Sequence, residues 1–424
     1  MSYQPKRLVC LLVMLAFGAG ASLHAQDTLR ITLPEAESRF IQKNLAVLAQ
    51  RYNIDIAKAQ IVQARLFNNP NVGFTGNIYN PDQKKAFDLS NHTGEYIIQA
   101  QQLVVLAGKR NKQVRLAETN TVLAENRLSD LLRTLRFTLR GDFYQLYFLQ
   151  NSIGSYSTQI SYLEKMNTAY QELLAKGVVT LKDALRIQSL LYTLKAEESS
   201  LQNQVNDVNA ELQLLLQNNA VFVVPIADSM YLQADPSQYN LPSLLDSAYA
   251  NRYDLKLAQN NILYSQQYYS LQKALATPDL TVGAQFDKRG SFVENAAFFT
   301  VAMDLPFFNR NQGNIRAAKI GVDQAKVQLR QQQSSIENEV QKAYIKAINT
   351  DKMLRSFDPR FKDQLQKLLS GVTENFRNKN IGLLEFTDFY DSYKENILRY
   401  NDLQNQRMQA IEALQFAIGK PLFN

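Results

Sequence analysis

The sequence predicts a mostly helical fold with a smaller β part, built from two copies of one plan. The chain of 424 residues holds only 16 glycines and 11 prolines, and a scarcity of these helix breakers favours long helices. Short blocks recur in the same order in both halves, which indicates a duplicated structural unit. Four short segments alternate apolar and polar residues, a pattern typical of β-strands.

The N-terminus has the pattern of a secretory signal. Lys6 and Arg7 precede an apolar run that ends near the small residue Ala25, so a signal peptide is predicted over residues 1–25. The run is 16 residues long, whereas a membrane-spanning helix needs roughly 20; a retained anchor helix is the alternative. The single cysteine, Cys10, lies inside the run, so the mature chain is predicted to have no disulfide and no lipid anchor.

Charge and composition exclude several functions. The net charge of +7 falls to +5 without Lys6 and Arg7, which is too mild to predict a nucleic-acid partner. His92 is the only histidine after the signal, and the mature chain has no phosphate-binding glycine loop. Its carboxylates have no accompanying residues with which they could form an acid–base catalytic site. We therefore expect no enzyme activity, cofactor or bound metal.

The duplication divides the chain. Leu33-Pro34 recurs as Leu241-Pro242, and Leu48-Ala49-Gln50 recurs as Leu257-Ala258-Gln259. Matching blocks at equal places in two halves indicate that each half folds to the same order of elements. The predicted division is a first repeat over residues 26–217, an inter-repeat segment over 218–240 and a second repeat over 241–424.

Each repeat is predicted to open with one helix, over residues 35–67 or 243–276, and to end with a long helical hairpin. Residues 109–175 contain no proline, and at ~1.5 Å per residue one helix there would be about 100 Å long. In the second repeat, over 312–379, Asp358-Pro359 should kink the helix or split it. Helices of this length belong to a coiled-coil array or a helical tube rather than to a globular core.

The alternating segments are predicted to be strands at residues 71–79, 93–103, 280–287 and 296–305. A strand of about nine residues is long enough to span a bilayer when it is tilted. The alternative is a soluble sheet packed on helices. Four strands cannot close a membrane barrel, which needs about eight, and open edges in lipid leave backbone groups without partners. Several chains must then contribute to one barrel, and three chains would give twelve strands.

The hairpin turns carry a common pattern. The first reads Lys176-Gly177-Val178-Val179-Thr180-Leu181-Lys182-Asp183, and the second reads Lys379-Asn380-Ile381-Gly382-Leu383-Leu384-Glu385. Gly177 and Asn380 are predicted to take the left-handed conformation that ends a helix, and Thr180 to cap the helix that follows. Apolar residues at an exposed turn suggest a binding partner; an ordinary helix–turn–helix corner is the alternative.

This order of signal peptide, duplicated strand pairs and long hairpins resembles the TolC-like outer-membrane efflux family over nearly the whole mature chain. Within it, the chain is most similar to outer-membrane components that work with resistance-nodulation-division transporters. The resemblance implies a homotrimer whose helices form a periplasmic α-barrel and whose strands, four per chain, complete a 12-stranded β-barrel among outer-membrane lipids. A periplasmic adaptor and an inner-membrane transporter are the implied partners.

The resemblance also assigns candidate sites. The implied gate carboxylates are Glu385, Asp388 and Asp391, with Asp183 as the counterpart in the first repeat. A ring of such groups would select cations and bind divalent ions when closed; a solvated helix face is the alternative. The implied adaptor-docking residues are Gly177, Val178, Val179, Thr180, Leu181, Asn380, Ile381, Gly382, Leu383 and Leu384.

The function expected from the resemblance is a passive conduit that passes small toxic compounds or metal ions from the periplasm to the exterior. Two alternatives stay open. The first is the outer-membrane exit duct of a type I-like protein secretion system, which shares the fold. The second is a periplasmic coiled-coil adaptor or structural protein, which the doubled strand pairs disfavour because adaptors usually carry one hairpin. The sequence does not separate drug, metal and protein cargo.

Overall fold

The computed structural model describes residues 28–218, 221–227, 234–289, 293–358 and 360–422. The predicted signal peptide therefore lies outside the described residues. The chain forms two compact units, and each draws on both sequence repeats. The hairpin unit comprises Met1–Asn44, Thr138–Gln233 and Leu354–Gln409, and the sheet unit comprises Leu45–Phe137, Ala234–Met353 and Ala410–Asn424.

Long helices dominate the described chain, and none of them combines the length and apolar character needed to cross a bilayer. The helix α4 runs without interruption over 67 residues, because no proline breaks its sequence. The helices are α2 (Leu33–Lys43), α3 (Leu45–Arg65), α4 (Lys109–Ala175), α5 (Leu181–Leu216), α6 (Leu241–Asn251), α7 (Tyr253–Leu275), α8 (Gln312–Arg355), α9 (Phe361–Arg377) and α10 (Leu383–Ile418).

The opening helix of each repeat is broken, which corrects the prediction of one continuous helix. Asn44 separates α2 from α3 with φ −63° and ψ 124°, and Arg252 separates α6 from α7 with φ −73° and ψ 124°. The Asn44 Nδ2 donates a hydrogen bond to the carbonyl of Leu215 at 3.1 Å. The Arg252 Nη1 donates to the carbonyl of Ala417 at 3.0 Å. Each break, here called a repeat joint, is thus hydrogen-bonded to the end of the last helix of its own repeat.

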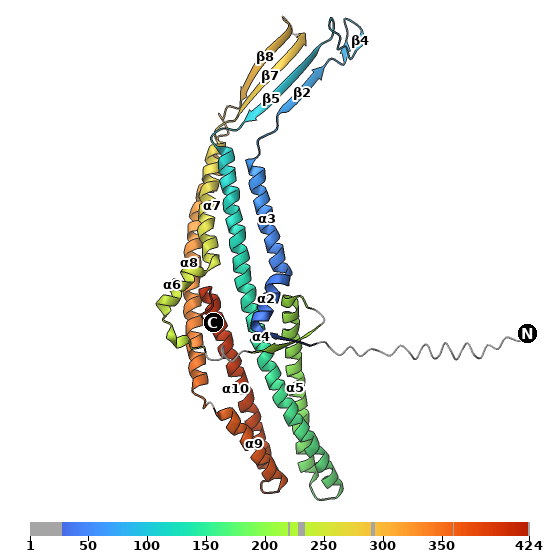
Figure 1. The fold of residues 1–424 in the computed structure, drawn as a ribbon, viewed down its shortest axis with the longest axis vertical. Coiled ribbons are helices and arrows are strands. Elements are labelled where there is room, and N and C mark those ends of the chain that lie inside the picture. Colours follow the sequence, from blue (N-terminus) through green and yellow to red (C-terminus); the bar gives the residue numbers. More distant parts are fainter. Residues whose placement is uncertain (1–27, 219–220, 228–233, 290–292, 359, 423–424) are drawn as a thin grey trace, which may run out of the picture. The chain divides into compact units, whose positions relative to one another are not determined.

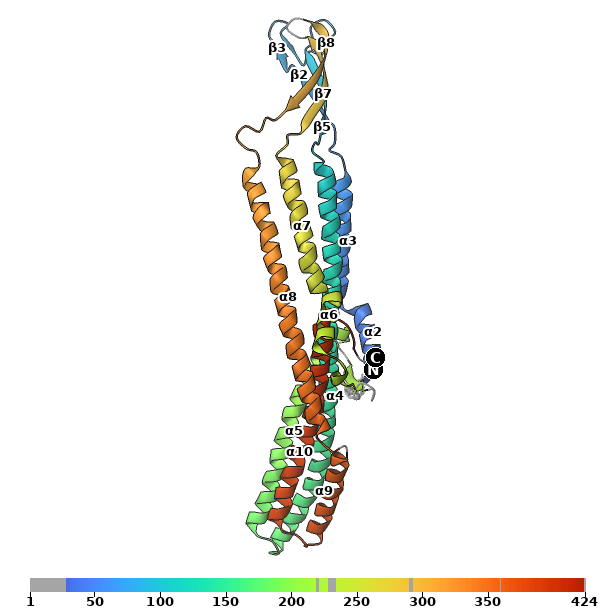
Figure 2. The same cartoon turned by 90° about the vertical axis from the view of Figure 1, so that its left-hand side faces the viewer.

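The second hairpin differs from the first. Its outgoing part is split between α8, which ends at Arg355, and α9, which begins at Phe361. The Asp358 Oδ1 accepts a hydrogen bond from the Arg360 backbone N–H at 2.8 Å, a local turn that replaces helical bonding. The predicted interruption near Asp358 is therefore a split into two helices. In the hairpin unit α9 and α10 lie side by side, as α5 does with the final part of α4 (Figures 1 and 2).

The sheet unit contains a four-stranded antiparallel sheet in the order β2-β5-β7-β8 (Figure 1). Each repeat supplies one neighbouring pair, and β5 and β7 join the two pairs. Its strands are β2 (Asn71–Gly76), β5 (Tyr96–Val104), β7 (Leu280–Arg289) and β8 (Glu294–Met303). The first expected strand is shorter than predicted, because β2 ends at Gly76 and a separate small hairpin follows, β3 (Tyr79–Asn80) with β4 (Lys85–Ala86).

A second sheet was not predicted. In the hairpin unit β1 (Thr28–Thr32) pairs in parallel with β6 (Phe222–Ile226). The buried Val223 anchors β6, because its N–H donates to Asn209 Oδ1 at 2.8 Å and its carbonyl accepts from Gln150 Nε2 at 3.1 Å. This pairing ties the start of the first repeat to the segment that follows it.

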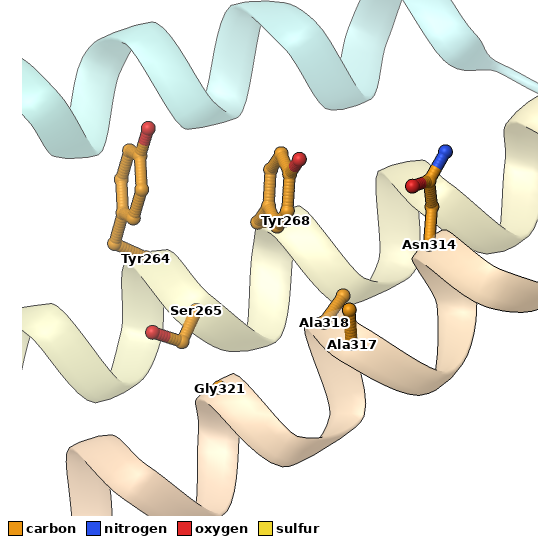
Figure 3. A pocket seen from close by; sticks show the side chains of 7 residues that line it. All are labelled: Tyr264, Ser265, Tyr268, Asn314, Ala317, Ala318 and Gly321. Atoms are coloured by element: carbon orange, nitrogen blue, oxygen red, sulfur yellow. The ribbon is translucent and has the colours of Figure 1, made fainter.

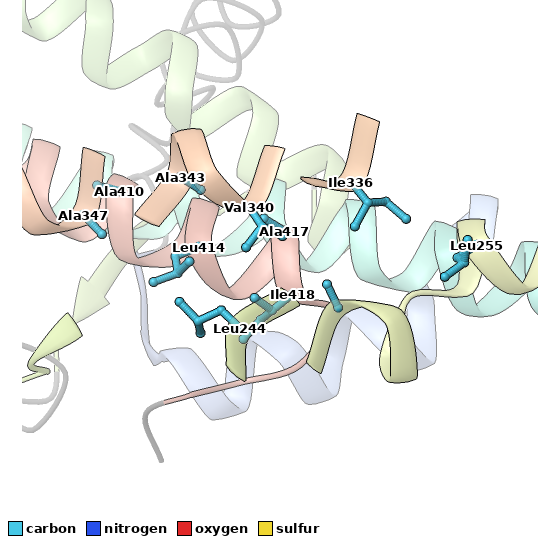
Figure 4. Packing of buried hydrophobic residues seen from close by; sticks show 11 residues of the cluster. Leu244, Leu255, Ile336, Val340, Ala343, Ala347, Ala410, Leu414, Ala417 and Ile418 are labelled. Atoms are coloured by element: carbon cyan, nitrogen blue, oxygen red, sulfur yellow. The ribbon is translucent and has the colours of Figure 1, made fainter. Parts of the chain in front are cut away.

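Each unit has its own apolar core. In the sheet unit, Leu244 of α6, Val340 of α8 and Leu414 of α10 meet in a buried cluster (Figure 4). In the hairpin unit the core is aromatic. Phe386 is fully buried, and its ring centroid lies 4.5 Å from that of Phe376 and 5.6 Å from that of Tyr390. Both Phe386 and Tyr390 belong to this buried cluster.

Candidate functional site

The first hairpin turn has the predicted geometry. Gly177 takes a φ of +72°, and the N–H of Val178 donates to the carbonyl of Leu173 at 2.9 Å, the bond that closes a helix end. Thr180 caps α5 by accepting from the Asp183 N–H at 3.2 Å. The turn is therefore fixed by its own backbone bonds and by the Thr180 cap.

In the second turn the left-handed residue is Lys379, with φ +62°, and not the predicted Asn380. The N–H of Asn380 donates to the Asn375 carbonyl at 2.9 Å, so Asn380 has the role of Val178. The prediction aligned the two turns wrongly by one residue, because it sought a residue type that tolerates positive φ. In the structure, Gly177 corresponds to Lys379, Thr180 to Gly382 and Asp183 to Glu385.

Replacing Lys379 by glycine is expected to stabilise the second turn. A residue with a side chain loses about 1 kcal/mol of stability in the left-handed region, and glycine avoids this loss. Glycine also has more conformational freedom in the unfolded chain, which reduces the net stabilisation. We expect a net gain of about 0.5 kcal/mol, seen as a higher midpoint of thermal unfolding in detergent. The matched control, Gly177→Lys at the equivalent place, should lower the midpoint. Shifts of the same sign in both variants would contradict this account.

The turns expose apolar side chains. Val178, Leu181 and Leu384 are 59%, 60% and 58% exposed, whereas Ile381 and Leu383 pack partly against the aromatic core. The residues predicted to dock an adaptor therefore divide into outward and inward groups. An exposed apolar surface at the end of a rigid hairpin is a candidate protein-binding site.

Three of the predicted gate carboxylates follow one another along α10. Glu385 and Asp388 are exposed, on a helix whose other face buries Phe386. Burial raises the pKa of the Asp391 carboxyl above its ordinary value, and the charges of Glu197 and Asp388 add to the rise. The charge of Lys394 opposes this rise.

Asp183 has a different role from these three residues. The Thr180 hydroxyl donates to its carboxylate at 2.7 Å, in addition to accepting from its N–H. Among the described residues no hydrogen bond or ion pair joins Asp183 to the part of α10 that carries Glu385, Asp388 and Asp391. The structure assigns it first to capping α5.

An ion-paired node in the hairpin unit was missed by the sequence reasoning. The Lys394 Nζ donates to both carboxylate oxygens of Glu197, at 3.1 and 3.0 Å, and the Tyr156 hydroxyl donates to Glu197 at 3.0 Å. The node joins α10, α5 and α4 close to the acidic stretch. A lysine placed between Asp391 and Glu395 was the available signal, but its partner is too remote in the sequence to be found by spacing.

The four-stranded sheet has two unlike faces, because side chains alternate along a strand and cross-strand partners share a face. One face is apolar, and Val72 and Phe299 on it are 73% and 76% exposed. Its rows are Val72, Ala100, Ala284 and Phe299, then Phe74, Ile98, Phe286 and Ala297. The other face is mainly polar, with the rows Asn71, Gln101, Gly283 and Thr300, then Gly73, Gln99, Gln285 and Phe298.

The hollows of the sheet unit do not hold a catalytic constellation within the part of the chain that is described. One of about 220 Å³ is lined by Tyr264 and Tyr268 of α7 and by the small residues Ala317, Ala318 and Gly321 of α8 (Figure 3). Its groups can donate or accept hydrogen bonds but include no acid–base pair. The described residues also contain no group of three His, Cys, Asp or Glu side chains that could hold a metal ion.

Long helical hairpins with exposed apolar turns, together with a sheet of one apolar and one polar face, are similar to the architecture of TolC-like outer-membrane channels. Residues 244–420 match the family described as outer membrane efflux protein. The chain is 23% identical over 412 residues to the cobalt-zinc-cadmium resistance protein CzcC of Cupriavidus metallidurans, with 92% of this chain and 90% of that protein covered.

Solved structures share the fold. The outer membrane protein VceC of Vibrio cholerae superposes with a TM-score of 0.70 at 16% identity, covering 92% of this chain and 96% of that one. The Campylobacter jejuni CmeC outer membrane channel gives a TM-score of 0.71 at 12% identity, covering 94% and 90%. These comparisons confirm the predicted resemblance to TolC-like outer-membrane efflux proteins.

Proposed function

We propose that this chain is the outer-membrane channel of a tripartite efflux system, a passive conduit that does no covalent chemistry. The two-faced sheet carries the proposal. An exposed apolar face is unfavourable in water but suits lipid, while a face of Gln, Thr and Asn side chains suits a water-filled lumen. The described hollows and turns supply no competing catalytic site.

Three copies of the chain would form the channel. Within the described residues β2 and β8 each have one neighbour only, and an unpaired edge in lipid costs several kcal/mol for each backbone group. Pairing β2 of one copy with β8 of the next would close twelve strands around one pore. The helices offer a matching surface, because α3 exposes a row of apolar side chains, Leu45, Leu48, Tyr52, Ile56 and Val62.

The periplasmic partners would meet the hairpin turns. The exposed Val178, Leu181 and Leu384 suit an adaptor with an apolar surface of its own, and an inner-membrane transporter would deliver cargo through that adaptor. The other predicted docking residues support the turn geometry, as Gly177 and Thr180 do by ending one helix and capping the next.

The gate would be formed by the acidic stretch of α10. Glu385, Asp388 and Asp391 are all exposed and available to line a constriction, and Asp183 would contribute from the first hairpin turn. In a trimer these groups are repeated three times, and a ring of carboxylates attracts cations and holds divalent ions.

The double substitution Glu385→Gln with Asp388→Asn removes both charges and keeps the size of the side chains. We expect weaker cation selectivity and reduced block by Mg²⁺ in planar bilayers, because two of the carboxylates that would bind the ion are neutral. Glu172→Gln with Glu374→Gln is the matched control, since it removes two exposed charges from α4 and α9 of the same unit. Equal block in both double variants and the unchanged protein would exclude these residues from the gate.

The cargo proposed for this chain is metal ions, on the basis of the relative named for cobalt, zinc and cadmium resistance. Deleting the gene should lower tolerance to these three ions, and the intact gene should restore it. A gene copy that carries Val178→Asp and Leu384→Asp should not restore tolerance, because an apolar adaptor surface would bind poorly to turns that carry charge. Unchanged metal tolerance together with lost export of a protein would instead support a secretion duct.

A further inference from the structure

A basic hollow lies where the central strands of the sheet meet their helices. It measures about 320 Å³ and opens between the first turns of α4 and the last turns of α7. Its lining residues are Ala107, Lys112, Tyr269, Ser270, Lys273 and Ala274. Neither the gate nor the docking turns of the proposed channel involve any of them.

Two ammonium groups in this hollow have no carboxylate partner among the residues that the structure describes. The Lys112 Nζ donates to the carbonyl of Ala107 at 3.0 Å, and the Lys273 Nζ lies 5.4 Å from the ring centroid of Tyr269. Lys109, one turn away, shows the contrast, because its Nζ is paired with Asp279 at 2.6 Å. The two unpaired cations therefore leave a net positive charge at one place.

The remaining groups of the hollow also favour an anion. The Ser270 hydroxyl is exposed and can donate a hydrogen bond. The first turn of α4 begins at Lys109, and the positive end of its helix dipole adds positive potential beside Lys112. Two lysine ammonium groups and a hydroxyl are donors that can bind a phosphate group.

The position of the hollow indicates the source of the phosphate, an argument that rests on the proposed function. Ala107 follows the end of β5, and Ala274 precedes the start of β7. If the sheet lies in the membrane, the hollow is at the level of the phospholipid headgroups of the periplasmic leaflet. Exposed apolar residues of the other two connections between helices and sheet fit this level, since Phe67, between α3 and β2, is 78% exposed and Phe308, between β8 and α8, is 95% exposed.

We propose that the hollow between Lys112 and Lys273 binds the phosphate group of an anionic phospholipid. A lipid with net negative charge is preferred over a zwitterionic one, because both lysines are uncompensated. Each basic residue near an anionic headgroup contributes roughly fivefold in affinity, so the pair supplies roughly thirtyfold.

Native mass spectrometry of the full-length protein in detergent tests this proposal. Phosphatidylglycerol, phosphatidylethanolamine and inorganic phosphate are added in separate arms. The unchanged protein should retain phosphatidylglycerol in preference to phosphatidylethanolamine, and Lys112→Gln with Lys273→Gln should lose that preference roughly thirtyfold. Lys112→Arg with Lys273→Arg should keep it, because the charge and donors remain.

The charge-matched control is Lys165→Gln with Lys367→Gln, two exposed lysines of the hairpin unit, and it should bind lipid as the unchanged protein does. Equal lipid preference in the Lys112/Lys273 glutamine variant and the unchanged protein overturns the proposal. Binding of inorganic phosphate that displaces the lipid overturns the lipid source. Conductance of the same samples separates the two proposals, because a working channel with unaltered lipid preference contradicts only this inference.

Discussion

Replacing Arg252 by methionine is expected to lower the free energy of unfolding by about 3 kcal/mol. The Arg252 side chain is almost wholly buried, and its Nη1 donates to Glu339 at 2.7 Å and to the Ala417 carbonyl at 3.0 Å. Burial would raise the pKa of Asp254, but the hydrogen bonds and charge of Arg252 and the charge of Arg133 bring it below its ordinary value. Without the guanidinium, a buried carboxylate loses its main partner.

The measurement is urea unfolding of the detergent-solubilised protein, followed by helical circular dichroism. Asn44→Ala is the matched control, because Asn44 occupies the other repeat joint but contributes a neutral hydrogen bond to Leu215. Its loss should cost only about 1 kcal/mol. If the two variants lose the same stability, the charge network around Arg252 adds nothing to the joint.

Asp142→Asn is expected to stabilise the protein above neutral pH. Asp142 lies in α4, is 9% exposed, and its Oδ2 has no hydrogen-bond partner among the described residues. Burial, with a smaller effect from the charge of Glu211, raises the pKa of Asp142 from 3.8 to about 7. Between pH 3.8 and about 7 the folded protein therefore keeps a proton on the Asp142 carboxyl, whereas the unfolded chain has released it.

The sign of the pH dependence follows from that difference. The contribution of Asp142 to stability is fully present below pH 3.8 and is lost as the pH rises through about 7, a loss of up to about 4 kcal/mol. Asparagine stays neutral, so the variant should unfold at higher urea than the unchanged protein at pH 8 and at nearly the same urea at pH 4. Glu211→Gln should give a smaller gain at pH 8. Parallel stability curves for Asp142→Asn and the unchanged protein would refute this account.

Local patterns were enough to predict the strands and hairpins. A period of two along residues 280–287 requires only that one face of a strand differ from the other. The absence of proline from 109 to 175 permits one long helix, as the structure has it. Gly177 could be placed in the left-handed region because glycine pays no steric penalty there.

Features that depend on remote contacts were not predictable from one sequence. Nothing in the local pattern around Asn44 breaks a helix; its side chain binds a carbonyl at Leu215. The pairing of β1 with β6 and the bond from Lys394 to Glu197 likewise join residues far apart in the chain. Lys379 was overlooked because lysine has no preference for the conformation that the end of α9 imposes on it.

The two repeat joints have a consequence for the order in which the chain can assemble. The first joint closes on Leu215, 171 residues further along the chain, and the second closes on Ala417, 165 residues further along. Neither joint can therefore form before the last helix of its own repeat has been made. A chain that stops before Ala417 leaves the Arg252 guanidinium without that acceptor.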